Sequence, residues 1–207
     1  MSASAPAGVP ARRRQASRLR ETRETRVRIA LDLDPVEPSA EISTGIGFFD
    51  HMLEAFARHS GISLTVEAEG DLHVDAHHTM EDVGLTLGEC LADALGDLKG
   101  VRRFGAAHVP LDEALSRVVV DLCGRPFLGW RVAFLAERVG ETPTELFEDF
   151  FRALTDRGRL TVHVDGLTGR NAHHVAETVF KAFARAFAEA KEVVGGAVPS
   201  TKGTLTD

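Results

Sequence analysis

The chain has few of the features that mark membrane, secreted or nucleic-acid-binding proteins. No apolar run in its 207 residues approaches the roughly eighteen residues of a membrane span. Its two cysteines, Cys90 and Cys123, are far apart and without CxxC spacing, which excludes a disulfide framework and predicts a reduced, cytoplasmic location. Acidic residues outnumber basic ones, 31 to 24, which gives a net charge of −7. This balance predicts no nucleic-acid partner, and the missing apolar run predicts no membrane partner.

The positive charge that is present is concentrated at the start of the chain. Residues 1–20 contain five arginines and no acidic residue, among alanine, serine and proline. We expect residues 1–17 to form a disordered basic tail, since they cannot bury enough apolar surface to fold. A transit peptide or a nucleic-acid arm has a similar composition, whereas the lack of an apolar stretch excludes a secretory signal.

Two segments of the chain repeat each other. Residues 63–81 and 159–177 align without a gap and are identical at eight of nineteen positions. The identities include the pattern His-His-x-x-Glu, which occurs as His77, His78 and Glu81 and again as His173, His174 and Glu177. A slip of two residues extends the alignment upstream and pairs His51 with Asp149. An internal duplication is the simplest explanation.

Hydrophobic periodicity predicts an α/β (α+β) fold. We expect strands at residues 25–33, 62–68, 72–74, 116–122, 130–134 and 160–164. We expect helices at residues 48–58, from about 78 to 96, at 144–155 and at 174–193. The order predicts two pseudo-symmetric β-plus-α halves, about 18–100 and 101–195, with helices packed on one side of the sheets. Together they form one domain, residues 18–207, which ends in a tail at 196–207.

The histidine pairs and their glutamates predict two metal sites. Residues four apart lie on one face of a helix, so the first His and the Glu of each pattern can reach one ion, while the second His faces another. Pseudo-symmetry groups His77 and Glu81 with His174, and His173 and Glu177 with His78. His51 and Asp149 complete the two sets. Imidazole and carboxylate without sulfur favour Mn, Fe, Co or Zn, and neighbouring subunits could supply some of the ligands. The pattern is not HExxH, which disfavours a zinc protease.

Three loops carry cations or hydroxyls bounded by glycine or proline. They are residues 102–105 (RRFG), 124–126 (GRP) and 199–203 (PSTKG). Arginine forks and a lysine point charge are the groups that bind a phosphomonoester. Taken alone, each segment is better explained as a solvated loop. Their coexistence with a metal site in an acidic protein favours a phosphorylated ligand.

Several motifs in order resemble the imidazoleglycerol-phosphate dehydratase family. The resemblance runs from about residue 18 to residue 202. The motifs are residues 21–25 (ETRET), 44–52 (TGIGFFDHM), 70–84 (GDLHVDAHHTMEDVG), 103–105 (RFG), 110–115 (PLDEAL), 169–177 (GRNAHHVAE) and 199–203 (PSTKG). Together these motifs are far more specific than the histidine pattern alone.

The resemblance implies an enzyme of histidine biosynthesis. It would remove water from D-erythro-imidazole-glycerol phosphate to give imidazole acetol phosphate, with two Mn²⁺ ions per active site. The resemblance also implies paired α/β halves like the second domain of ribosomal protein S5. The chain would be a homo-oligomer, built from trimers that assemble into a 24-mer with active sites shared between chains.

By position, the resemblance also implies the site residues. One ion would take His51, His78, His173 and Glu177. The other would take His77, Glu81, His174 and Asp149, and at this last place many family members have His. The predicted catalytic residues are Glu24, which is not a metal ligand, and all of these ligands except Asp149. The substrate contacts carry over onto Glu24, Arg103, Arg125, Lys181, Ser200, Thr201 and Lys202.

The hypothesis for the mechanism is that the ions stabilise the imidazolate of the substrate, which expels the neighbouring hydroxyl, while Glu24 moves the proton. A surface carboxylate is the alternative interpretation of Glu24. Two other functions compete with the dehydratase. One is a dinuclear metal hydrolase that cleaves a phosphoester, and the other is a non-catalytic assembly in which ions only join subunits.

Overall fold

The computed structural model describes residues 13–198 and 200. The first half contains β1 (Gln15–Glu21), β2 (Thr25–Asp32), β3 (Ala40–Ser43), α1 (Gly47–Ser60), β4 (Ser63–Gly70) and α2 (His77–Leu95). The second half contains β5 (Phe104–Leu111), β6 (Ala114–Asp121), β7 (Phe127–Arg131), β8 (Arg138–Val139), β9 (Thr142–Pro143), α3 (Leu146–Gly158), β10 (Thr161–Thr168) and α4 (Ala172–Ala190). Apart from the small β8–β9 hairpin, the second half repeats the element order of the first.

The two halves also have the same sheet topology. The first sheet has the order β1-β2-β4-β3 and the second has the order β5-β6-β10-β7. Strand β3 pairs parallel with β4, and β7 pairs parallel with β10. The other neighbours in these two sheets are antiparallel. The predicted duplication and the mixed α/β class are therefore confirmed by the fold.

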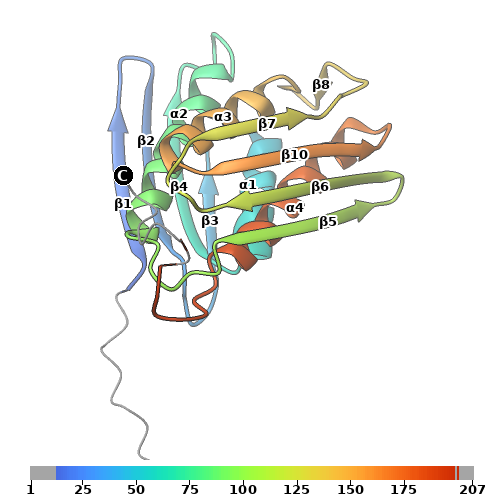
Figure 1. Cartoon of the computed structure of the whole chain (residues 1–207). Coiled ribbons are helices and arrows are strands. Elements are labelled where there is room, and N and C mark those ends of the chain that lie inside the picture. Colours follow the sequence, from blue (N-terminus) through green and yellow to red (C-terminus); the bar gives the residue numbers. More distant parts are fainter. Residues whose placement is uncertain (1–12, 199, 201–207) are drawn as a thin grey trace, which may run out of the picture.

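The helices lie between the two sheets (Figure 1). Helices α1 and α2 pack on the first sheet, α4 and α3 pack on the second, and α2 meets α3 while α1 meets α4. Each sheet thus has its helices on one side, as the sequence predicts. Strand β2 shows the cause, because Val27, Ile29 and Leu31 alternate inward into the core while their neighbours face solvent.

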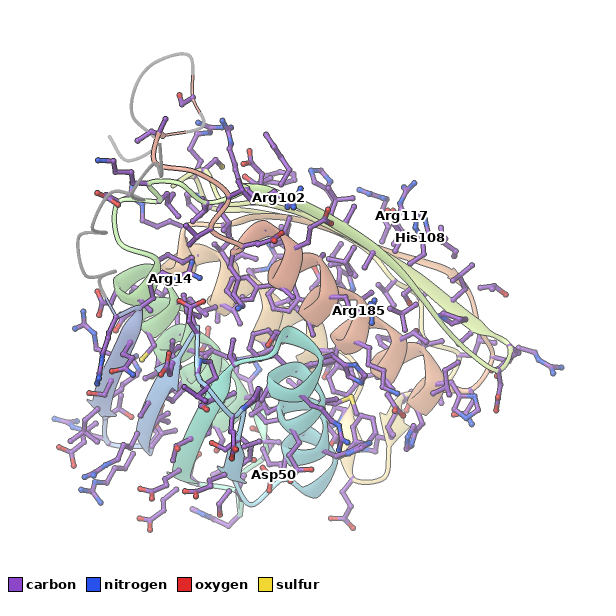
Figure 2. All side chains as sticks on the ribbon, turned by 90° about the horizontal axis from the view of Figure 1, so that it is seen from below. Arg14, Asp50, Arg102, His108, Arg117 and Arg185 are labelled. Carbon is purple, nitrogen blue, oxygen red and sulfur yellow. The ribbon has the colours of Figure 1, made fainter. Side chains whose placement is uncertain are left out.

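The contact between α2 and α3 depends on small residues. A Cβ atom added at Gly84 would lie 2.7 Å from the carbonyl oxygen of Phe150, and one at Gly88 would lie 2.6 Å from that of Leu154. Such close backbone approach is possible only for glycine. Among the described residues, the helices pack on the inner faces of the sheets, and His108 and Arg117 project from the outer face of the second sheet in Figure 2. Within the described part of the chain, no helix has the length and apolar character to cross a membrane.

Three predictions about the elements need correction. Residues 72–74 form turns rather than a strand, with the Val74 amide donating to Asp71 O at 2.7 Å. The strand predicted at 130–134 is β7 and lies three residues earlier. Residues 15–17, assigned to the basic tail, belong to β1, and Arg14 just before them pairs with Asp34 at 2.5 Å and donates to Lys191 O. Residues 1–12 of that tail lie outside the described residues.

Candidate active site

Three metal-capable side chains converge where α1 and α4 begin. His51 lies in the first turns of α1, and His173 and Glu177 lie one turn apart on α4. Their ligand atoms all lie within 4.8 Å of one another. We call His51, His173 and Glu177 half-site A. It combines a helix of the first repeat with a helix of the second, so it exists only because the two halves pack together.

The pseudo-symmetric position holds a second group. His77 and Glu81 lie one turn apart on α2, and Asp149 lies in the first turn of α3. Asp149 Oδ2 is 3.6 Å from His77 Nδ1, and Glu81 Oε2 is 4.0 Å from His77 Nε2. We call His77, Glu81 and Asp149 half-site B. The gapped alignment of Asp149 with His51 therefore names a residue that does lie beside a histidine of the repeat.

The two half-sites differ in composition. Half-site A offers two imidazoles and one carboxylate, whereas half-site B offers one imidazole and two carboxylates. In half-site A, burial raises the pKa of Glu177, but the hydrogen bond and charge of Lys181 outweigh burial and leave that pKa below its usual range. Lys181 Nζ lies 2.6 Å from the Glu177 carboxylate. The ionised Glu177 is ready to bind a cation.

The second histidine of each pair belongs to neither half-site within one chain. His78 Nδ1 lies 3.1 Å from Asp71 Oδ2, and His174 Nδ1 lies 2.8 Å from Glu113 Oε2. The hydrogen bond to Asp71 raises the pKa of His78, and the hydrogen bond to Glu113 raises that of His174. The grouping of His78 with half-site A and of His174 with half-site B thus does not occur inside a single copy.

Glu24 lies close to this region. It sits in the turn between β1 and β2, is exposed, and has its carboxylate 3.8 Å from His78 Nδ1. The turn is fixed to α2, because the Thr25 hydroxyl donates to Asp82 and Arg20 pairs with Asp82 at 2.7 Å. An exposed carboxylate held beside a metal-capable histidine can exchange protons with a bound ligand.

The predicted phosphate-binding residues lie elsewhere. Arg103 directly precedes β5, and its guanidinium contacts Asp121 at 2.7 Å. Exposed Arg125 lies just before β7, at the same end of the second sheet, and the segment before Ser200 runs past residue 100 through hydrogen bonds of 2.8–3.2 Å. Thr201 and Lys202 lie outside the described residues.

The metal-capable residues and the arginines are at opposite ends of the second sheet. His174 and Glu113 meet at the far end of β5 from Arg103, and an eight-residue strand spans roughly 23 Å. One small substrate therefore cannot touch both groups of a single copy. Lys181, a predicted substrate contact on α4, does lie beside half-site A, because its ammonium is 2.6 Å from Glu177.

Two carboxylates of this region, Glu113 and Asp71, are not among the site residues predicted from the sequence. Glu113 lies in the turn between β5 and β6, the counterpart of the turn that holds Glu24. Its carboxylate accepts hydrogen bonds from the backbone amide of Asn171, from His174 and from the amide of Arg170, and these lower the pKa of Glu113 to about 2. A comparison of the two hairpin turns in the repeat alignment would have indicated Glu113.

A family model described as imidazoleglycerol-phosphate dehydratase matches residues 44–187. The chain belongs to the imidazoleglycerol-phosphate dehydratase family. The imidazoleglycerol-phosphate dehydratase of Magnetococcus marinus is 53% identical over 197 residues, which cover 94% of this chain and 99% of that protein. The matched range 44–187 contains all residues of both half-sites, together with Arg103, Glu113 and Arg125.

Solved dehydratase structures share the fold. The crystal structure of imidazoleglycerol-phosphate dehydratase from Staphylococcus aureus superposes with a TM-score of 0.79 at 40% identity, over 87% of this chain and 99% of that one. The dehydratase of Pyrococcus furiosus gives the same TM-score at 35% identity, over 91% of this chain and 100% of that one. The two-half architecture described above is therefore that of this dehydratase family.

Proposed function

We propose that the chain removes water from D-erythro-imidazole-glycerol phosphate to give imidazole acetol phosphate, a step of histidine biosynthesis, with two Mn²⁺ ions per active site. The activity follows from family membership, since relatives that carry this name match nearly the whole chain. The observation that carries the metal-dependent mechanism is the pair of half-sites, each built from both repeats.

The donor atoms of half-site A fit Mn²⁺. His51, His173 and Glu177 place nitrogen and oxygen donors within 4.8 Å of one another, close enough for one ion. Imidazole and carboxylate donors without sulfur suit Mn²⁺, which leaves positions open for a substrate. Bound ions would act as Lewis acids that lower the pKa of an imidazole ligand.

The protein side chains supply binding and proton transfer. Glu24 would move the proton at the reacting carbon, and its exposed carboxylate, 3.8 Å from His78, supports this role. Lys181 lies beside half-site A, where its ammonium can contact an anionic group of the substrate. Arg103, Arg125 and the tail residues Ser200, Thr201 and Lys202 would hold the phosphate.

We propose that each active site is shared between copies of the chain. Two observations support this. The arginines lie a strand length from the half-sites, and His78 and His174 are turned away from both half-sites of their own chain. A homo-oligomer that brings the arginine end of one copy to the histidine end of another satisfies both. Trimers that assemble into a 24-mer are the arrangement proposed here.

A cytoplasmic location is proposed as well. Cys90 and Cys123 are both buried and unpaired. Burial raises the pKa of the Cys90 thiol to about 12, so this side chain is a neutral, unreactive part of the core. Two buried cysteines without a disulfide are compatible with a reduced compartment.

Incubation with imidazole-glycerol phosphate and Mn²⁺ tests the function. The dehydratase produces an enolisable ketone that retains its phosphate. A dinuclear phosphoester hydrolase would instead release inorganic phosphate, and a metal-structured assembly would give no turnover. Absence of the ketone at full metal loading contradicts the proposed function.

Asp149 should make the two ion sites unequal in metal preference. Carboxylate oxygen favours hard cations such as Mn²⁺, while imidazole nitrogen favours Zn²⁺ and Co²⁺. We therefore expect Asp149→His to raise the affinity of half-site B for Zn²⁺ relative to Mn²⁺, measured by competitive titration calorimetry. The reciprocal His51→Asp should shift half-site A toward Mn²⁺. If the ratio of Zn²⁺ affinity to Mn²⁺ affinity were unchanged in both variants, Asp149 would not be a ligand of the ion.

A further inference from the structure

The second histidine of each pair has a carboxylate at its Nδ1 atom. His174 Nδ1 meets Glu113 Oε2 at 2.8 Å, and His78 Nδ1 meets the two oxygens of Asp71 at 3.1 and 3.2 Å. The first histidines are arranged differently. His173 directs Nε2 toward Glu177 on its own helix at 3.1 Å, and His77 lies between Glu81, 4.0 Å from Nε2, and Asp149, 3.6 Å from Nδ1, which is longer than a hydrogen bond. A carboxylate hydrogen-bonded at Nδ1 is thus shared by the second histidines of both halves, which indicates that the two histidines of a pair have different tasks.

Glu113 is itself held in place from two directions. Its other oxygen, Oε1, accepts hydrogen bonds from the backbone amides of Arg170 at 3.0 Å and Asn171 at 2.8 Å, just before α4. At the start of β6, the Ser116 hydroxyl bonds the Thr178 hydroxyl of α4 at 2.8 Å. The carboxylate therefore has little freedom to leave His174.

The first half has a corresponding arrangement. The Asp71 amide donates to Glu24 O at 3.1 Å, so Asp71 is tied to the hairpin turn of its own half. That turn is fixed to α2 by the contact between Thr25 and Asp82. Both second histidines are thus oriented by a carboxylate from outside their helix.

The chemistry of these contacts decides which nitrogen is free. An ionised carboxylate can only accept hydrogen bonds, so the Nδ1 atom that it contacts must carry the hydrogen. A neutral imidazole with hydrogen on Nδ1 has its lone pair on Nε2, and that is the atom able to bind a cation. Carboxylate partners of this kind fix the tautomer and the ring orientation of metal-binding histidines.

We propose that Glu113 and Asp71 are positioning residues, which hold His174 and His78 in the Nδ1–H form and present each Nε2 atom to an ion bound by another copy of the chain. The inference rests on the proposed function only for the identity of that ion and its other ligands. The tautomer itself is a property of the metal-free chain. It can therefore be measured separately from catalysis.

The variant Glu113→Gln tests the positioning. The single amide oxygen of Gln is expected to keep the two backbone hydrogen bonds, which leaves its NH₂ group facing His174 Nδ1. An NH₂ group donates, so the neutral ring should switch to the Nε2–H tautomer, which cannot ligate through Nε2. Nitrogen-15 NMR of the metal-free protein, at a pH where the ring is neutral, reads the tautomer directly. Calorimetry should show Mn²⁺ affinity falling about 10- to 100-fold.

Asp112→Asn is the matched control. Asp112 is the other carboxylate of the same turn, it acts on His174 only through its charge, and Asn tolerates its positive φ of 46°. The control should leave the tautomer unchanged. Asp71→Ala removes the acceptor at His78 Nδ1 and should lower the population of the Nδ1–H tautomer of His78, which keeps the test available if Glu113→Gln unfolds.

Two results would overturn the proposal. One is an Nε2–H ring at His174 in the unmodified protein. The other is a folded Glu113→Gln protein with unchanged tautomer and unchanged Mn²⁺ affinity. A tautomer switch with weakened Mn²⁺ binding supports the positioning role even if the ketone is never formed. In that case the proposed dehydration fails by itself.

Discussion

Glu24→Gln should lower kcat for the dehydration roughly 10²- to 10⁴-fold, the range that a positioned acid or base contributes. Glutamine has nearly the same shape as glutamate but cannot take up or release a proton. Because Glu24 belongs to neither half-site, Mn²⁺ content should stay unchanged. Steady-state kinetics with atomic absorption on the same sample measure both quantities.

Glu21→Gln is the control for Glu24. Glu21 lies in the same hairpin and pairs with Arg26 at 2.9 Å on its exposed side. Removing that carboxylate changes the local charge by the same amount, and kcat should stay near the unmodified value. If Glu24→Gln were as active as Glu21→Gln, Glu24 would have no part in proton transfer.

The second large effect is expected at Glu177. Glu177→Gln removes the carboxylate of half-site A, which contacts His173 at 3.1 Å and Lys181 at 2.6 Å. Changes to outer partners of metal ligands already weaken binding by about 10- to 100-fold, and loss of a ligand should exceed this. We expect atomic absorption to show one Mn²⁺ per chain in place of two, with the loss of nearly all dehydratase activity.

Two further variants serve as the counterpart and the control for Glu177→Gln. Glu81→Gln should remove the other ion, because Glu81 is the counterpart of Glu177 in half-site B. Glu148→Gln should retain both, since Glu148 is next to Asp149 but pairs with Arg152 at 2.5 Å. Full Mn²⁺ loading in both Glu177→Gln and Glu81→Gln would show that neither glutamate is a ligand.

The central strands could be predicted from the sequence more closely than the edge strands. Strands β2, β4, β6 and β10 are central in their sheets, and each buries alternate residues over part or all of its length, which gives a period of two. Of the edge strands of these two sheets, β7 lies three residues from its predicted place, and the sequence pattern does not predict β1, β3 and β5. Strand β1 buries none of its residues fully, and β5 contains Pro110, which is tolerated only at an edge.

The site residues on helices could also be predicted from their spacing in the sequence. His173 and Glu177 are one turn apart and do meet, and the repeat alignment points to His51 and Asp149. The partners of the second histidines were not predictable in this way. Glu113 is 61 residues from His174, and only the pairing of β5 with β6 brings its turn to the start of α4. Likewise, the spacing of motifs gives no sign that Arg103 lies far from the histidines.

An anomalous difference map, recorded at the manganese edge from crystals grown with Mn²⁺, tests the shared dinuclear site most directly. We expect two peaks per chain, one beside His51, His173 and Glu177 and one beside His77, Glu81 and Asp149. Each should be completed by Nε2 of His78 or His174 from another copy. Peaks away from both groups, or no peaks at all, would contradict the account.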